Sequence, residues 1–361
     1  MKKRFAPAAA LLALAGGPVL AQSSVTVYGV VDVGLYGKQL SGTARTKNVD
    51  SGVMETSYLG FRGSEDLGDG LRANFDLSAF MTPDNGGATR GIPAETFWSR
   101  SAWVGVTGPW GALRLGRMST PNFINNIRFN PFGASATISP TFLHTYLGSA
   151  SQPMATGGGA TDSGWNNSLG YTSPSLGGFV VALQGAPGEG GSGGRRVGGS
   201  VTWAGTPFAA MLSFDRTTRA ALTFPLALPA LPGALPPFTA SEFSTLQLGA
   251  SYDLQLVKLF AQFARTEITG TRPGPPGEKT IALRTLQLGL AAPLGSGRVL
   301  LSAARTAKQQ TLVADASRTT VTLGYDHDLS KRTDVYAALM SDKVSELSRG
   351  TGYTLGIRHR F

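Results

Sequence analysis

The chain has 361 residues and a formal net charge of +10, with 32 Lys and Arg against 22 Asp and Glu. It has no cysteine, which excludes disulfides and every metal or nucleophile site that needs a thiolate. The arginines are spread singly along the chain, without basic clusters that contain aromatic residues, so the positive charge does not predict a nucleic-acid-binding protein.

Residues 1–21 have the layout of a secretory signal peptide. A basic start (KKR) precedes the apolar stretch AAALLALAGG, and VLA before Gln22 is typical of a cleavage site. A spanning helix needs about 20 apolar residues, and the sequence GGP interrupts this shorter run. We therefore expect export, cleavage after Ala21 and a mature domain of residues 22–361.

From Ser24 onward, apolar residues alternate with polar or small residues for about ten residues at a time. Each run ends at a cluster of Gly, Pro, Asn or Asp, so sixteen segments are predicted as strands. In chain order they are residues 24–37, 51–63, 70–82, 96–107, 111–117, 165–173, 177–186, 196–204, 207–216, 243–253, 257–267, 281–292, 297–307, 317–328, 332–343 and 351–361.

The connections between these segments alternate between tight turns and long loops, and residues 118–164 form the longest connection. An even number of antiparallel strands, with short turns at one end and long loops at the other, is typical of a transmembrane barrel. The sequence therefore predicts an all-β fold, a 16-stranded antiparallel transmembrane β-barrel. The Pro-rich residues 224–238 are expected in one of the long loops because proline disfavours strands.

The two faces of the predicted strands differ in polarity. In the first strand Val25, Val27 and Leu35 lie on one face, while Tyr28 and Asp32 lie on the other. An apolar outside and a polar inside indicate lipid around the barrel and water in its lumen. The last strand must then pair with the first, because an open sheet edge cannot lie in lipid.

Large aromatic residues are expected on the lipid side or at the membrane boundaries. Trp98 is left open, because it falls on the same face as Arg100. The full set is Trp98, Trp103, Trp110, Trp165, Trp203, Tyr353 and Phe361.

Five motifs in order resemble the general diffusion porins of Gram-negative outer membranes, with most likeness to those of Burkholderia, Bordetella and Neisseria. They are SYLGFRGSEDLGDGLRANFDL, RSAWVGVTGPWGALRLGR, NNSLGYTSPSLGGF, DHDLSKRTDVYAAL and the final GIRHRF. The resemblance covers nearly all of residues 22–361 and implies a homotrimer. It also implies that residues 118–164 fold into the lumen as a constriction loop, and that the assembly machinery of the outer membrane reads the terminal Phe361.

The resemblance further implies which side chains line the constriction. Arg100, Arg62 and Asp76 match inward positions of the family, and alternation places Arg100 on the face opposite Trp103. Arg72 and Arg114 share inward faces by parity. Arg117 matches a position at the root of the constriction loop, where an anchoring role is as plausible as a contact with ions.

Two departures from the family pattern affect selectivity. Tyr58 and Gly164 stand where relatives often carry arginine, and residues 118–160 contain no Asp or Glu, only Arg128 and His144 as possible charges. With Asp76 as the only nearby acid, the constriction is expected to be positive and to favour anions. The alternative for each arginine is a solvated charge that does not affect selectivity.

The sequence thus predicts an outer-membrane porin that lets small hydrophilic solutes and ions diffuse passively, in contact with lipid and lipopolysaccharide. A substrate-specific channel for phosphate or an organic acid on the same scaffold is the alternative. A barrel enzyme is a remote one, because no serine and carboxylate arrangement surrounds His144, His327 or His359. No catalytic residue, cofactor or metal site is expected, and no nucleic-acid partner.

Overall fold

The computed structural model describes residues 24–90, 95–145, 163–188, 194–224, 238–271, 277, 279–310 and 315–361. These residues form two short helices and 17 strands that belong to one sheet. No helix in these ranges has the length and hydropathy needed to cross a membrane. The expected signal peptide, residues 1–21, lies outside the described residues.

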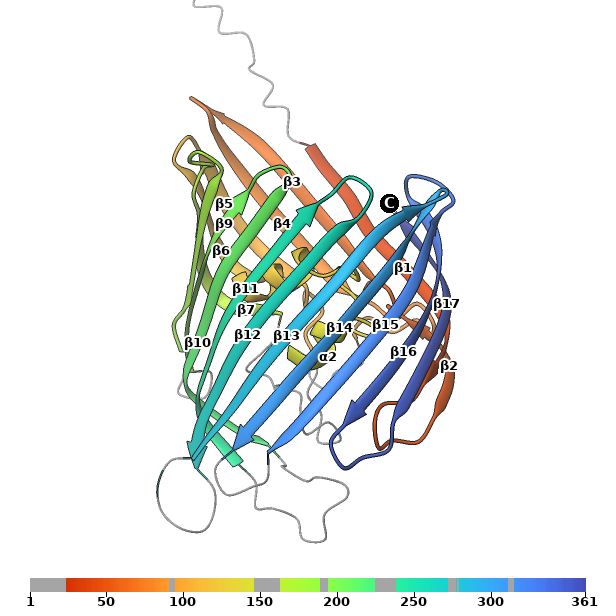
Figure 1. The fold of residues 1–361 in the computed structure, drawn as a ribbon. Coiled ribbons are helices and arrows are strands. Elements are labelled where there is room, and N and C mark those ends of the chain that lie inside the picture. The colour runs from red at the N-terminus through yellow and green to blue at the C-terminus, as the bar shows by residue number, and fades with distance from the viewer. Residues whose placement is uncertain are drawn as a thin grey trace, which may run out of the picture.

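The strands follow the predicted order along the chain (Figure 1). Their bounds are β1 Ser24–Lys38, β2 Thr46–Ser51, β3 Tyr58–Gly68, β4 Leu71–Phe80, β5 Ser101–Gly108, β6 Gly111–Ser119, β7 Gly164–Thr172, β8 Phe179–Ala186, β9 Arg195–Ala204, β10 Phe208–Phe224, β11 Phe238–Asp253, β12 Lys258–Thr271, β13 Lys279–Leu294, β14 Gly297–Gln310, β15 Ala316–Asp328, β16 Thr333–Val344 and β17 Gly350–Arg360. The helices α1, Pro121–Arg128, and α2, Pro140–Thr145, lie between β6 and β7.

The sheet closes into a barrel of 16 positions. From β3 to β17 each strand pairs antiparallel with the next, and β17 returns to β1 with Val30 opposite Arg360 and Gly37 opposite Tyr353. The other edge of β1 pairs with two strands: β3 pairs with its first half and β2 with its second half. Strands β2 and β3 therefore occupy a single position in the barrel. Closure satisfies the backbone groups that an open edge would expose to lipid, and the predicted 16-stranded antiparallel barrel is confirmed.

The break between β2 and β3 was not predicted. Residues 51–63 were expected as one continuous strand after a long loop, but residues 46–51 already pair with β1 and residues 52–57 leave the sheet. Gly52 has φ +69°, a value that favours glycine, and its N–H donates to the Asp32 carbonyl at 2.8 Å. The Asp32 carboxylate accepts the N–H groups of Met54 (3.1 Å) and Glu55 (2.8 Å), which replace the lost ladder bonds.

Short turns gather at one end of the barrel and long connections at the other. Asp69 and Gly70 form a two-residue turn with positive φ at both positions, as tight hairpins require. We call the two ends the short-turn end and the long-loop end. The C-terminus lies at the short-turn end, where Phe361 and Gly29 exchange two backbone hydrogen bonds of 3.1 and 3.2 Å.

The outer face is apolar and the inner face is polar, as alternation predicted. Val25, Leu288 and Leu339 are each about 60 % exposed, while the inward Gln247 and Gln287 are buried. Two tryptophans depart from the expectation. Trp165 is only 2 % exposed and Trp103 lies on the inner face, so the prediction that these rings meet lipid or the membrane boundary was wrong.

Candidate pore constriction

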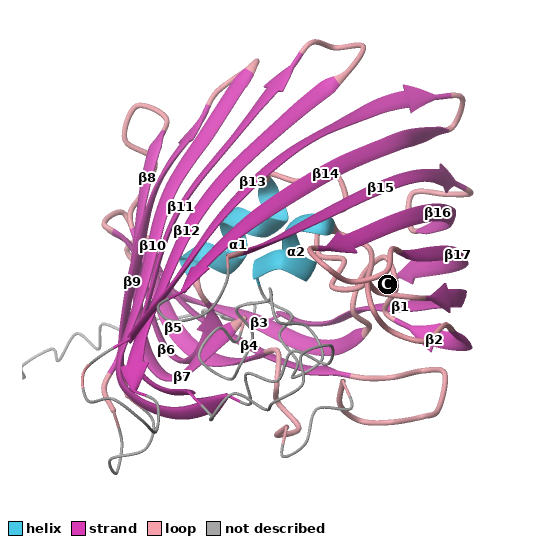
Figure 2. Cartoon of the chain, turned by 60° about the horizontal axis from the view of Figure 1, so that its bottom comes forward, coloured by secondary structure: helices cyan, strands magenta, loops and turns pink. Residues whose placement is uncertain are grey.

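The chain between β6 and β7 begins with helix α1, and we call residues 120–163 the long loop. The Thr120 hydroxyl accepts the N–H of Phe123 at 3.2 Å, and Pro121 occupies the first turn, which are both typical of a helix start. In Figure 2 α1 and α2 lie inside the ring of strands. The sequence did not predict these helices, because each has eight residues or fewer and such helices depend on tertiary contacts.

Helix α1 is attached to the inner face of β10, β11 and β12. The Asn125 amide donates to the Ser213 hydroxyl at 2.9 Å, and the Asn122 amide donates to the Thr245 carbonyl at 3.3 Å. Gln262 on β12 donates to the Asn126 carbonyl at 3.3 Å. Asparagines on one side of the helix thus replace the water that would otherwise cover this part of the wall.

Helix α2 is attached to β14 and β15 through His144. Its two ring nitrogens lie 2.7 Å from the Thr306 hydroxyl and 2.8 Å from the Thr320 hydroxyl. Arg318 donates to the Leu143 carbonyl at 2.9 Å and to the Asp342 carboxylate at 2.8 Å. Burial, with a smaller contribution from the Arg318 charge, lowers the pKa of His144 to about 3. The histidine is therefore neutral at physiological pH and adds no charge to the loop.

The turn between the helices packs further round the wall, against β14 to β16, β1 and the break after β2. Phe132 and Ile138 share an apolar cluster with Tyr36, Val53 and Tyr336. The Ser135 hydroxyl donates to the Val53 carbonyl at 2.6 Å, and the Thr322 hydroxyl donates to the Ile138 carbonyl at 2.8 Å. The described part of the long loop therefore contacts the wall from β10 through β15 and round to β2.

The inner face of β3 to β5 carries a different set of residues, centred on Arg100. The guanidinium carbon of Arg100 lies 3.8 Å from the centre of the Tyr58 ring. One of its terminal nitrogens is 3.3 Å from the Ser78 hydroxyl and 3.5 Å from the Tyr28 hydroxyl. A guanidinium stacked on an aromatic face gains a cation–π attraction, so Tyr58 holds Arg100 in place.

Arg62 and Asp76 complete this group. They are direct cross-strand partners on β3 and β4 and therefore share a face. Arg62 stacks on the Tyr28 ring at 4.9 Å, and the Tyr28 hydroxyl donates to the Asp76 carboxylate at 2.5 Å. Tyr28 lies on the polar face that the sequence identified, but a tyrosine alone gave no signal of a place among these charges.

Arg114 and Trp103 extend the group onto β5 and β6. The Arg114 guanidinium lies 4.9 Å from the Trp103 ring, and Trp103 is the cross-strand partner of Asp76. Arg100 and Trp103 therefore face the same interior, although alternation placed them on opposite faces. The reason is that Arg100 precedes β5, which starts at Ser101, so the period of two does not reach it.

The remaining candidates lie elsewhere. Arg128 ends α1 and is exposed on the side of the helix away from the wall. Arg72 lies at the short-turn end, 3.9 Å from Asp66, with both side chains more than half exposed. Arg117 donates to the carbonyls of Ser99 (2.6 Å) and Gly164 (3.3 Å), an arrangement that fits an anchor for the root of the long loop.

A network of charges that sequence analysis did not identify lies on β14 to β17. The Asp326 carboxylate accepts from Arg298 at 2.5 Å and from Arg358 at 3.1 Å, and Asp334 accepts from Arg358 at 3.1 Å and from Arg360 at 2.7 Å. Glu55 lies 3.4 Å from Arg358. Three arginines thus face three carboxylates, so the network is close to neutral.

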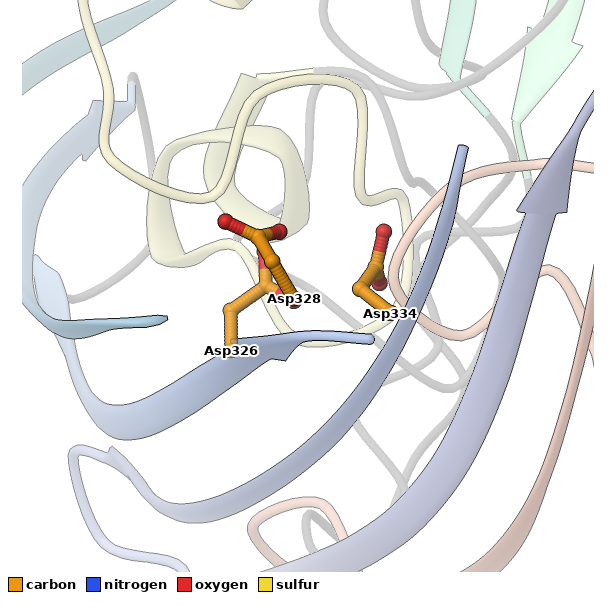
Figure 3. Close-up of side chains that lie close together, drawn as sticks. All are labelled: Asp326, Asp328 and Asp334. Carbon is orange, nitrogen blue, oxygen red and sulfur yellow. The ribbon is translucent and has the colours of Figure 1, made fainter. Parts of the chain in front are cut away.

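Figure 3 shows the carboxyl groups of Asp326, Asp328 and Asp334 close together. One oxygen of each lies within 4.8 Å of the others. Arginines already pair with Asp326 and Asp334, so two of these three carboxylates belong to the ion-pair network, and Asp328 lies beside it.

Comparisons with known proteins agree with this architecture. A model described as Gram-negative porin matches residues 8–347. The outer membrane porin protein 32 of Delftia acidovorans is 32% identical over 390 aligned positions, and an outer membrane porin of Bordetella pertussis is 27% identical; both alignments cover 100% of each chain. The solved anion-selective porin from Comamonas acidovorans has a TM-score of 0.75 and 28% identity, and covers 94% of this chain and 100% of its own.

Proposed function

This chain belongs to the Gram-negative porin family, and from that premise we propose that it is an anion-preferring diffusion channel whose narrowest part lies between the long loop and the Arg100 wall. We define the Arg100 wall as Tyr28, Tyr58, Arg62, Asp76, Arg100, Trp103 and Arg114. Its relatives include outer-membrane porins of Delftia and Bordetella. The proposed permeants are small hydrophilic solutes and ions.

The observation that carries the anion preference is a charge imbalance around the constriction. Arg62, Arg100 and Arg114 form no ion pair within the described part of the chain, and Arg128 on the long loop adds a fourth positive charge. Asp76 is the one acid in the Arg100 wall, while the network on β14 to β17 is balanced. A narrow, low-dielectric passage focuses such a field on passing ions.

Reversal potentials across a planar bilayer with a salt gradient test the proposal. We expect the reversal potential to have the sign of a channel that is more permeable to anions than to cations. The chloride conductance should not saturate as the salt concentration rises. A reversal potential of the opposite sign would contradict anion preference while leaving the channel itself established by its conductance.

A substrate-specific anion channel is a second candidate, favoured by the way Tyr58 and Ser78 hold Arg100 in one position. A fixed guanidinium can bind a carboxylate or phosphate with two parallel hydrogen bonds. Saturable block of chloride conductance by one such anion would support this candidate, whereas flux that scales only with size and charge would support general diffusion.

We also propose the finer features that the family resemblance implies. Residues 1–21 act as a cleaved signal peptide, the channel assembles as a homotrimer, and the final strand is read by the outer-membrane assembly machinery. N-terminal sequencing of the mature protein tests the first feature. Conductance that appears in steps of three tests the second.

A further inference from the structure

The outward face of three neighbouring strands repeats one pattern. On β12, β13 and β14, toward the long-loop end, the three outward residues directly before an arginine are apolar. The arginines are Arg265, Arg284 and Arg305, which we call the arginine row. The apolar residues before them are Leu259, Ala261 and Phe263 on β12, Leu290, Leu288 and Leu286 on β13, and Val299, Leu301 and Ala303 on β14.

Strand pairing brings the three guanidinium groups together. Arg265 lies directly opposite Arg284, and Arg305 lies opposite Leu286, which places it diagonal to Arg284. Cβ atoms of direct partners are about 5 Å apart, and like charges in such pairs repel. The sheet therefore concentrates positive charge on its outer surface at a cost to its own stability.

Among the described residues, one carboxylate, that of Glu267, pairs with the arginine row. Glu267 accepts from Arg265 at 2.5 and 3.0 Å. Arg284 and Arg305 are exposed, and neither has a hydrogen-bond or ion-pair partner among the described residues. Three positive charges and one negative charge leave an excess of two.

The arginine row lies where the membrane ends. On β13 the outward residues from Leu294 to Leu286 are all apolar, and Arg284 comes next. Ten residues at about 3.4 Å each span about 34 Å, which is about 26 Å in height on a strand tilted by about 40°. The apolar band of such barrels is about 25 Å tall, so Arg284 emerges at its upper boundary, toward the long-loop end.

We propose that the arginine row binds the phosphate groups of a phosphorylated lipid in the outer leaflet. Arginine binds phosphate through two parallel hydrogen bonds, and basic side chains beside the hydrocarbon region attract anionic head groups. The bound phosphates supply the counter-charge that Arg284 and Arg305 lack, while the acyl chains cover the leucines below. This site lies on the outer surface, so the proposal does not depend on the anion preference of the pore.

Binding of diphosphoryl lipid A to the detergent-purified full-length protein tests the proposal. We expect the R284Q/R305Q variant to bind this lipid at least tenfold more weakly than the wild type. R284K/R305K keeps the positive charges but lacks the planar guanidinium groups, so its affinity for this lipid should lie between those of the wild type and R284Q/R305Q. The control K331Q/R332Q removes two exposed charges from the turn at the short-turn end and should bind as the wild type does.

Two further measurements separate this role from others. Lipid A without its phosphates should bind the wild type and R284Q/R305Q equally weakly. The single-channel conductance and the reversal potential of R284Q/R305Q should equal those of the wild type. Equal binding of diphosphoryl lipid A by the wild type and R284Q/R305Q would overturn the proposal, as would wild-type binding that does not depend on the phosphates. Heat-modifiable migration on gels verifies that each variant is a folded barrel.

Discussion

Tyr58 shows how one residue changes the chemistry of the wall. The family resemblance predicts an arginine at this position, and the tyrosine removes one positive charge but gives Arg100 an aromatic face at 3.8 Å. The wall loses net charge while its central guanidinium becomes fixed. In the proposed constriction we therefore expect ion selectivity to depend on Arg100 more than on any neighbouring charge.

We therefore expect R100A to reduce the preference for anions. One unit charge at about 4 Å is worth about 1 kcal/mol in water-like surroundings, which is about a fivefold change in the permeability ratio. Reversal potentials at a fixed salt gradient measure it. R72A, which removes an exposed arginine at the short-turn end, is the matched control, and equal effects of the two substitutions would refute a special role for Arg100.

The folded structure disfavours protonation of the His144 ring. Its pKa of about 3 lies below the usual value near 6.5 because the ring is buried beside Arg318. As the pH falls, the histidine of the unfolded chain binds a proton before His144 of the folded chain does. The stability that depends on a neutral His144 is therefore fully present above about pH 6.5 and is lost toward pH 3. We expect the midpoint of thermal unfolding to fall over this range, and to fall less in H144Q; identical pH profiles would contradict this.

At the scale of elements, alternation predicted the strands well because a barrel wall is apolar on one side and polar on the other at nearly every level. It failed where the chain leaves the sheet. Residues 52–57 bulge away to meet the Asp32 carboxylate, and the Trp165 side chain is buried, with its ring beside Gly198 on β9. Contacts between segments far apart in sequence decide both cases, and a period of two carries no information about them.

The same limit applies to the candidate constriction. The arginines were recognisable from motifs and parity, whereas their aromatic partners Tyr28 and Trp103 were not. The cation–π contacts depend on the register of β1 with β3 and of β5 with β6, which a single sequence does not specify. The helices of the long loop were missed for a related reason, since hydrogen bonds to the barrel wall hold them in place.

The end of strand β17 closes the barrel through the terminal Phe361. Deleting Phe361 removes two backbone hydrogen bonds to Gly29 at the junction between the first and last strands, as well as an exposed terminal aromatic. We expect a lower yield of assembled barrel in the outer membrane, measured by heat-modifiable migration, with normal conductance in the channels that do form. F361Y, which keeps the backbone and the ring, is the control; a deletion variant that assembles at the wild-type yield would disprove the prediction.

On the scale of the whole molecule, the charges are divided by region. The network on β14 to β17 balances itself, whereas the Arg100 wall and Arg128 keep a positive excess. The anion preference should therefore weaken as salt rises, because screening acts over about 10 Å at 0.1 M and about 3 Å at 1 M. Permeability ratios from 0.05 to 1 M salt at a constant gradient test this, and a ratio independent of salt would point to size or specific binding instead.

The long loop also has a mechanical consequence. It is fastened to β10 through Asn125, to β14 and β15 through His144, and to the break after β2 through Ser135. A loop held at widely separated points of a ring acts as a cross-brace, which resists flattening of the barrel into an ellipse. We therefore expect lateral tension in the bilayer to change the bore of the passage only weakly, because the attached loop opposes deformation of the surrounding sheet.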